Sequence, residues 1–188
     1  MERHKSIASR EVQAAITRLA AGIAERHAGH GEIWLLGIAN GGVALAARLA
    51  AALRPLSDLK LKTGTLDISF HRDDLGRHPI PKEFSPSELP GDVTGALIVL
   101  VDDVLFTGRT VKAALDELFD HGRPARVELA VLVDRGQRRL PVAPDYVGLT
   151  LAAAAEEEVT VTLAAGGASG ADAVRIAPAQ PCLPVPPS

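Results

Sequence analysis

Hydrophobic residues recur at helical spacing in three windows of the chain. The windows are residues 9–23, 40–53 and 111–119. In the first, one side carries an apolar stripe formed by Val12, Ile16, Leu19 and Ile23. Ser9 is the predicted N-cap of that helix, Phe119 is expected on the apolar face of the third helix, and Gly122 is its predicted stop.

Between these windows lie segments with the apolar character of β-strands. They are residues 32–39, 63–70, 95–103, 126–136, 145–149, 159–163 and 173–177. Strands that are apolar throughout and alternate with helices are typical of parallel sheets covered on both faces. The pattern predicts an α/β fold with a parallel twisted sheet flanked by helices. The segments 159–163 and 173–177 are predicted to pair with each other across a Gly/Ala/Ser turn.

Two segments show little periodicity. Residues 71–92 contain four prolines and many charges, and loops of this length are often functional lids, although a merely tolerated surface loop is the alternative. Residues 178–188 are rich in proline and are predicted to be a disordered tail. The remaining residues 1–177 are expected to form a single domain.

The composition narrows the class of protein. Of the 188 residues, 47% are hydrophobic and 23% are charged, and the net charge is -3. This balance argues against binding nucleic acid by bulk attraction, but it leaves room for a local basic face. The single cysteine, Cys182, allows no internal disulfide. No segment resembles a signal peptide or a membrane span, so we expect a cytoplasmic protein without a membrane partner.

The chemistry concentrates in one stretch, VLVDDVLFTGRT at residues 99–110. Asp102 and Asp103 stand at the end of the most apolar strand, where adjacent carboxylates repel each other and resist desolvation. Residues 107–110 follow at the start of a helix, where backbone N–H groups and two hydroxyls suit a phosphate. The acids would repel that phosphate, but they suit ribose hydroxyls or a Mg²⁺ ion held through water. A capped helix without a ligand explains Thr107 or Asp103 alone, but not the whole set.

These residues resemble the motif by which type I phosphoribosyltransferases bind 5-phosphoribosyl-1-diphosphate (PRPP). The flanks GTLDISFHRDDL at 64–75, the segment 111–136 and LPVAPDYVG at 140–148 resemble the PyrR family. Members of that family are uracil phosphoribosyltransferases that also act as pyrimidine operon attenuators. The resemblance runs from about residue 6 to about residue 163. It implies a type I phosphoribosyltransferase fold with a flexible flap at about 71–92 and a small C-terminal hood.

The resemblance also implies roles for individual residues. Two acids would bind the ribose hydroxyls of PRPP, and the turn after them would hold its 5-phosphate; these residues are Asp102, Asp103, Thr107, Gly108, Arg109 and Thr110. Catalytic roles would fall to Asp103 and to Arg72, which begins the flap. The region of the base and metal would include Val133, Asp134 and Arg135.

The implied reaction converts uracil and PRPP into UMP and diphosphate. Mg²⁺ would neutralise the diphosphate, and UMP or UTP would be the regulatory ligands. The implied assembly is a homodimer or a higher homo-oligomer. Specificity for another base is an alternative, because contacts with the base are expected to come largely from the backbone.

Two departures from the family pattern bear on this function. The turn that faces diphosphate usually reads Thr-Arg-Gly, and here it is Asn40, Gly41 and Gly42, so a cation is missing and reduced turnover is expected. After Tyr146 the family usually has a lysine and a Pro-Thr-Ser-Lys-type segment, whereas this chain has LTLAAAAEEE at residues 149–158. A catalytically weak, nucleotide-sensing RNA-binding attenuator is therefore the alternative function.

The resemblance also implies binding of an RNA stem-loop. The candidate contacts on the first helix are Thr17, Arg18 and Arg26, and a weaker candidate group is Arg135, Arg138 and Arg139. The alternative for the helix is an ordinary solvated face, since the acids at 156–158 would repel phosphates. Five histidines are expected at the surface: His4, His27, His30, His78 and His121. Trp34 and Tyr146 are expected in the core.

Overall fold

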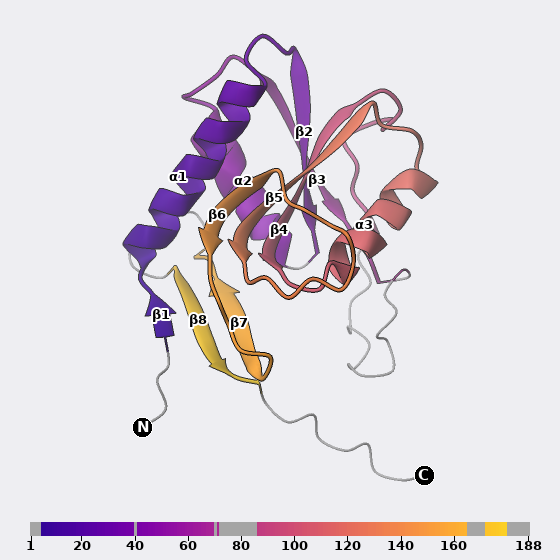
Figure 1. Cartoon of the computed structure of the whole chain (residues 1–188). Coiled ribbons are helices and arrows are strands. Elements are labelled where there is room, and N and C mark those ends of the chain that lie inside the picture. Colours follow the sequence, from indigo (N-terminus) through magenta and orange to yellow (C-terminus); the bar gives the residue numbers. More distant parts are fainter. Residues whose placement is uncertain (1–4, 40, 70, 72–85, 165–171, 180–188) are drawn as a thin grey trace, which may run out of the picture.

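The computed structural model describes residues 5–39, 41–69, 71, 86–164 and 172–179. Figure 1 shows the elements in chain order. The helices are α1 (Ser9–Arg26), α2 (Gly41–Leu53) and α3 (Arg109–Asp120). The strands are β1 (Lys5–Ile7), β2 (Glu32–Ile38), β3 (Lys60–Leu66), β4 (Leu97–Leu105), β5 (Arg126–Asp134), β6 (Tyr146–Thr150), β7 (Glu157–Thr162) and β8 (Ala173–Pro178).

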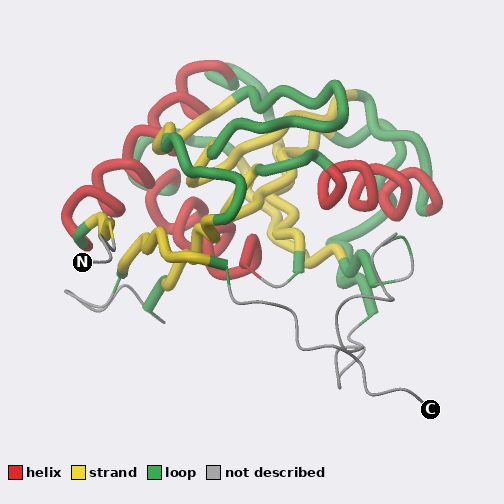
Figure 2. The backbone as a smooth tube through the Cα atoms, turned by 60° about the horizontal axis from the view of Figure 1, so that its bottom comes forward, coloured by secondary structure: helices red, strands yellow, loops and turns green. Residues whose placement is uncertain are grey.

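The centre of the molecule is a five-stranded sheet in the order β3-β2-β4-β5-β6. All four neighbouring pairs are parallel, so every strand ends at the same edge of the sheet. The helices α1 and α2 cover one face and α3 covers the other (Figure 2). The predicted parallel sheet flanked by helices is confirmed.

A second, antiparallel sheet has the order β1-β8-β7. The predicted pairing of residues 159–163 with 173–177 is confirmed, since Val159 lies opposite Ile176 and Val161 opposite Val174. The sheet lies at the end of the molecule where the parallel strands finish (Figure 1). We call this sheet the hood.

Two apolar cores hold the layers together. On one face of the sheet, α1 and α2 pack with the hood in one continuous cluster, to which the hood contributes Val159, Val174 and Ile176. On the other face, α3 packs over β2, β4 and β5. Trp34 and Tyr146 are 4% and 8% exposed, so their predicted place in the core is confirmed.

Several predicted boundaries were wrong. The strand predicted at 63–70 is β3, which starts at Lys60 because it pairs with β2 from Glu32 onward. It ends at Leu66, after which the Asp67 carboxylate accepts hydrogen bonds from the backbone N–H and hydroxyl of Ser69. The strand predicted to end at residue 103 is β4, which continues through Leu105 beside β5.

Three predictions at element ends were also wrong. Ala8 is the N-cap of α1, Ser9 is the first helical residue, and no side chain caps the helix. Phe119 is 41% exposed, and the Arg123 guanidinium lies over its ring. The predicted tail included Pro178, which belongs to β8, and the Ala179 N–H donates to the Glu156 carbonyl. Residues 180–188 of that tail lie outside the described residues.

Glycine is required where α2 begins against β4. A Cβ atom on Gly42 would lie 2.0 Å from the carbonyl oxygen of Val101, which is a backbone atom that cannot turn away. Gly42→Ala is therefore expected to lower the free energy of unfolding by roughly 1–3 kcal/mol through overpacking. Urea denaturation measures this loss. Gly31→Ala is the matched control, because a Cβ there would meet nothing within 4 Å, and an equal loss in both variants would contradict the explanation.

Candidate functional site

The two adjacent acids lie inside β4, near the edge where the parallel strands end. Asp102 is 5% exposed and Asp103 is half-buried. Burial, together with the negative charge of Asp103, raises the pKa of Asp102 well above its ordinary value. Burial also raises the pKa of Asp103. Two carboxylates held at such a cost suit a ligand that donates hydrogen bonds to them, as a diol does.

The turn before α2 lies directly against this acidic pair. A Cβ atom on Gly41 would lie 2.2 Å from Oδ2 of Asp103. A side chain at position 41 would therefore require the Asp103 carboxylate to move. Glycine at this position therefore allows the Asp103 carboxylate to lie where it does.

The segment after β4 forms a turn that leads into α3. Gly108 is the N-cap of α3 with φ 90°, in the left-handed region that favours glycine. The carbonyl oxygen of Thr107 accepts the N–H groups of Arg139 and Leu140 at 3.0 and 3.1 Å. The N–H of Arg109 donates to the Thr107 hydroxyl at 3.3 Å. The turn thus places the Thr107 hydroxyl at the amino end of α3, where the N–H groups of a first helical turn suit an anion.

Arg138 supports this turn, and its role was not predicted from the sequence. Its guanidinium donates to the carbonyl oxygens of Leu105 and Phe106 at 3.3 and 2.8 Å. It also forms an ion pair with Asp134, 2.7 Å from Nη2 to Oδ2. Asp134 in turn accepts the N–H of Gly136 at 2.8 Å. Arg138 therefore ties the ends of β4 and β5 together, and this internal role weakens it as an RNA contact.

Arg135 is a buried cation at the same edge. It is 6% exposed, its guanidinium lies 3.9 Å from the ring centroid of Phe106, and Nη2 donates to the carbonyl oxygen of Ala154 at 3.0 Å. Gln137 donates to the neighbouring carbonyl of Ala153 at 2.7 Å. The alanine-rich segment after β6 is thus held in place by the turn after β5.

The residues implied by the resemblance are brought together only in part. The described ones at the carboxyl edge are Gly41, Gly42, Asp102, Asp103, Thr107, Gly108, Arg109, Thr110, Asp134 and Arg135. The side chain of Val133 is fully buried in the core, so contact with a ligand would have to come from its backbone. Asn40 and Arg72 lie outside the described residues.

The RNA candidates on α1 have partners within the fold. Nη2 of Arg18 donates to the carbonyl oxygen of Gly148 in β6 at 2.7 Å, and the Thr17 hydroxyl donates to the Gln13 carbonyl at 3.0 Å. Arg26 donates to Asp145 at 2.9 Å and lies 5.1 Å from the ring centroid of Tyr146. The arginines therefore fasten α1 to β6, and they are not simply solvated.

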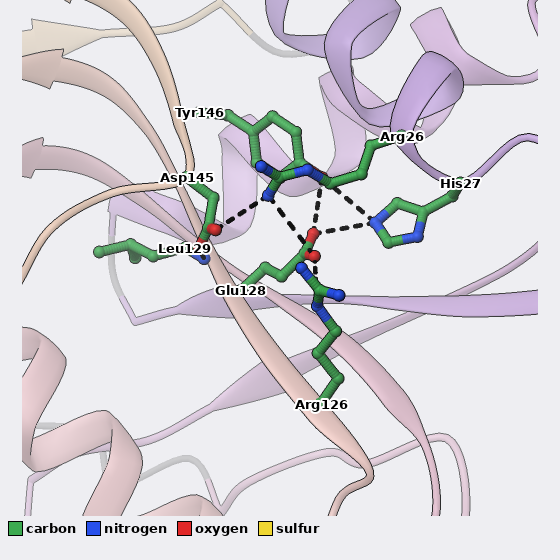
Figure 3. Close-up of polar contacts among 7 residues, drawn as sticks. All are labelled: Arg26, His27, Arg126, Glu128, Leu129, Asp145 and Tyr146. Atoms are coloured by element: carbon green, nitrogen blue, oxygen red, sulfur yellow. Dashed lines mark hydrogen bonds and ion pairs between the residues drawn. The ribbon is translucent and has the colours of Figure 1, made fainter.

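Arg26 belongs to a polar cluster around a buried glutamate, drawn in Figure 3. Glu128 is 2% exposed; its Oε2 accepts from the Tyr146 hydroxyl at 2.6 Å and lies 2.9 Å from Nε2 of His27. His27 is itself only 2% exposed, so its predicted place at the surface was wrong. The cluster lies at the amino ends of β5 and β6, at the opposite end of the sheet from Asp103.

The described residues form no metal cage by themselves. Within ranges 5–39, 41–69, 71, 86–164 and 172–179, no three His, Cys, Asp or Glu side chains are grouped so that they could hold a metal ion. In the same ranges, no helix has the length and apolar character needed to cross a membrane.

Comparison with known proteins identifies relatives over most of the chain. A family model described as "Phosphoribosyl transferase domain" matches residues 5–164. The bifunctional protein PyrR of Roseiflexus sp. (strain RS-1) is 47% identical over 168 residues, which are 88% of this chain and 91% of that relative. The bifunctional protein PyrR of Streptomyces coelicolor is 51% identical over 155 residues, 82% of this chain and 80% of the relative.

Solved structures show the same fold at low sequence identity. The hypoxanthine phosphoribosyltransferase of Trypanosoma cruzi is 18% identical with a TM-score of 0.65, and the match covers 91% of this chain and 94% of that one. A hypoxanthine-guanine phosphoribosyltransferase from Bacillus anthracis is 19% identical with a TM-score of 0.64, covering 96% and 99%. The predicted type I phosphoribosyltransferase fold is confirmed.

Proposed function

This chain belongs to the phosphoribosyltransferase family, and on that premise we propose that it transfers the phosphoribosyl group of PRPP to uracil, giving UMP and diphosphate. The observation that carries the proposal is the placement of the acidic pair directly before the helix start at Gly108. One ligand with a diol and a phosphate satisfies both features. The relatives named PyrR at about half identity favour uracil as the base.

The acidic pair would hold the ribose. The hydroxyls of the ribose would donate to Asp102 and Asp103, and a donor there offsets the burial that raises the pKa of both acids. The 5-phosphate would bind the N–H groups and hydroxyls of Thr107 and Thr110 at the start of α3. Catalysis would come mainly from fixing the ribose and from stabilising the charge that leaves with diphosphate.

The donor set at this edge suits Mg²⁺ bound together with the substrate. Mg²⁺ prefers oxygen ligands, retains several waters and is commonly held by one or two carboxylates plus phosphates, which agrees with a carboxylate pair that forms no cage alone. Asp102 and Asp103 would hold it through water. When bound, the ion supplies neutralisation of the diphosphate charge.

The base would lie between the turn after β5 and the alanine-rich segment after β6. Arg135 and Gln137 hold the carbonyls of that segment, so its backbone is ordered where a base would need donors and acceptors. Phe106 adds an apolar ring beside Arg135. A pyrimidine can be recognised there by backbone groups without a dedicated side chain.

We propose as a second function the regulation of pyrimidine genes through an RNA stem-loop. The relatives are named "bifunctional", which agrees with a second role beside the transferase. Arg18, Arg26 and Thr17 remain the proposed contacts, since all three are exposed on α1. Because both arginines also bind β6, an RNA contact there would involve side chains that are already ordered.

An assay for UMP from uracil and PRPP with Mg²⁺ tests the proposed enzyme, with adenine, guanine and hypoxanthine as control bases. Of the four bases, only uracil is expected to give turnover with PRPP. The rate is expected to be reduced, because Gly41 supplies no cation to the diphosphate. Turnover with a purine instead would contradict the base. Absence of turnover with every base, alongside measurable binding of UMP, would favour the nucleotide-sensing regulator.

A further inference from the structure

The turn after β5 contains a residue in a backbone conformation that its type rarely adopts. Gln137 has φ 59°, and within the described residues it is the only non-glycine residue with a positive φ. Its neighbour Gly136 has φ 72°, so two successive residues of this turn lie in the left-handed region. A residue with a Cβ atom is sterically disfavoured there, and such a conformation persists only where the surrounding structure fixes it.

The residues on either side of Gln137 fix this conformation. The Gly136 N–H donates to the Asp134 carboxylate at 2.8 Å, and the Gly136 carbonyl oxygen accepts from the Arg138 guanidinium at 3.2 Å. Arg138 is itself held by the carbonyl oxygen of Phe106, to which it donates at 2.8 Å. The backbone of the turn is therefore anchored around Gln137, and its side chain has a defined direction.

The side chain of Gln137 reaches the alanine-rich segment after β6. Its Nε2 donates to the carbonyl oxygen of Ala153 at 2.7 Å. Ala153 is 7% exposed and packs in the core that α1, α2 and the hood share. A hydrogen bond that ends on a buried residue is shielded from competition with water, and its loss is therefore felt by the segment as a whole.

Three contacts join the turn after β5 to residues 151–154. Besides the bond from Gln137, the Leu151 N–H donates to the Asp134 carbonyl oxygen at 2.9 Å, and Arg135 donates to the Ala154 carbonyl oxygen at 3.0 Å. The contact of Gln137 is the one that comes from a residue in a disfavoured conformation. Backbone strain of this kind is found where a ligand site has to be held in one arrangement, which points to a function for the contact.

We propose that Gln137 is a positioning residue, which holds residues 151–154 against the turn after β5 and thereby sets the affinity for uracil. This inference rests on the proposed function, which places the base between that turn and that segment. When the Ala153 carbonyl is released, only a fraction of the molecules keeps the segment in the arrangement that binds, and the apparent affinity falls by that fraction. The proposed contacts with PRPP lie on β4 and at the start of α3, so the affinity for PRPP is expected to stay the same.

The test compares Gln137→Met and Gln137→Gly with Gly29→Ala, all in the full-length protein. Methionine has a similar length but neither a donor nor a charge, so it loses the bond to Ala153 and keeps the disfavoured φ. Glycine loses the same bond but adopts the left-handed region freely. Gly29→Ala is the control for stability alone, because Gly29 has φ 84° in the turn between α1 and β2, and a Cβ atom there would meet nothing within 4 Å.

Both Gln137 variants are expected to raise KM for uracil roughly three- to tenfold through the loss of one hydrogen bond, with KM for PRPP changed by less than about twofold. In thermal denaturation, Gln137→Gly is expected to have the higher Tm of the two, because only Gln137→Met keeps the strain. Gly29→Ala is expected to lower Tm and to leave both KM values unchanged.

Amide hydrogen exchange reports on the segment directly. The N–H groups of Leu151, Ala154 and Glu157 are all hydrogen-bonded, to the Asp134 carbonyl, the Glu157 carboxylate and the Ala154 carbonyl respectively. Their exchange is expected to become faster in both variants at position 137 and to stay unchanged in Gly29→Ala.

An unchanged KM for uracil, or equal increases in KM for both substrates, would overturn the positioning role. A KM for uracil that follows stability would overturn it too, because a purely structural role predicts a value near that of the wild type in Gln137→Gly and a raised value in Gln137→Met. Unchanged hydrogen exchange would overturn the proposed attachment.

The proposed function can fail separately from this inference. If the wild-type protein makes no UMP from uracil and PRPP, the proposed function fails. Calorimetric titration with UMP and with PRPP then decides the role of Gln137. The role is supported if both variants weaken the binding of UMP and leave that of PRPP unchanged, and any other result overturns it.

Discussion

Asp103→Asn is expected to lower kcat/KM for UMP formation about a hundredfold while the protein remains folded. Asparagine keeps the shape of the side chain but replaces a carboxylate oxygen with an NH₂ group, which cannot accept a hydrogen bond from a ribose hydroxyl. A charge-assisted hydrogen bond contributes about 1.5–3 kcal/mol, which corresponds to roughly ten- to a hundredfold in rate. Asparagine also carries no charge, and the loss of the negative charge opposite the ribose lowers the rate further. Steady-state kinetics with PRPP as the varied substrate measure the effect.

The same substitution is expected to stabilise the folded protein above mildly acidic pH. Burial raises the pKa of Asp103 in the folded state, so the folded state binds more protons than the unfolded chain between the ordinary value of 3.8 and the raised value. Stability of the wild type therefore falls as the pH rises through that window. In Asp103→Asn the fall is smaller, and denaturation by urea at a series of pH values shows it. A variant less stable than the wild type at neutral pH would contradict this reading of the site.

The proposed binding of an RNA stem-loop provides an internal control for Asp103→Asn. The substitution lies at the carboxyl edge of the sheet, whereas Arg18 lies on α1, so RNA binding is expected to persist. Arg18→Glu is expected to do the reverse and weaken RNA binding while UMP formation continues, with β6 slightly loosened by the loss of the bond to Gly148. Equal loss of both functions in either variant would contradict the division into two surfaces.

Glu128→Ala is expected to lower the free energy of unfolding by about 3–5 kcal/mol, because it removes the centre of a buried polar cluster. The variant would remove the acceptor that the Tyr146 hydroxyl and His27 share, and would leave them only their 3.2 Å contact with each other. A buried polar group that loses its hydrogen-bond partner costs about 1–3 kcal/mol. Arg126, whose Nε lies 2.6 Å from Oε1 of Glu128, loses its partner too, but it is 57% exposed and adds little. Thermal and urea denaturation measure the loss.

The pH dependence identifies the charge of Glu128 as the cause. Burial opposes ionisation, but the hydrogen bonds from Tyr146 and His27 lower the pKa of Glu128 below its ordinary 4.5. A lowered pKa gives stability that is present above 4.5 and is lost as the pH falls through the folded value. The difference between the wild type and Glu128→Gln should therefore shrink in acid. Glu25→Ala removes the same charge from an exposed position on α1, and a similar loss there would contradict a specific role for Glu128.

The sheet and the turn between β4 and α3 could be predicted from the sequence because both depend on local patterns. Buried parallel strands are apolar throughout, and the order of strands and helices limits the topology. Asp102 and Asp103 were conspicuous because acids rarely end such a run. The glycine at 108 marks a left-handed position that few other residues adopt.

Contacts between distant segments could not be predicted in this way. The Lys-Ser-Ile strand β1 is too short to show a period, and only its partner β8 reveals it. Glu128 lies in a strand that looks like its apolar neighbours, and its burial depends on His27 and Tyr146, which are 101 and 18 residues away along the chain. Arg138 looks like a surface cation until the carbonyls of the 105–107 turn are placed beside it.

The pairing of β1 with β8 has a consequence for the order of assembly. Lys5 in β1 lies opposite Ile176 in β8, the central strand of the hood. The hood therefore pairs residues from the two ends of the described chain. During synthesis the five parallel strands are complete when residue 150 has left the ribosome, but the hood has to wait for residues 173–178. Contacts between residues so far apart in the sequence form late, because the entropy cost of closing the loop comes before the contacts add any stability. The protein therefore acquires its central sheet first and its full hood last, and β1 stays unpaired until residues 173–178 have been made.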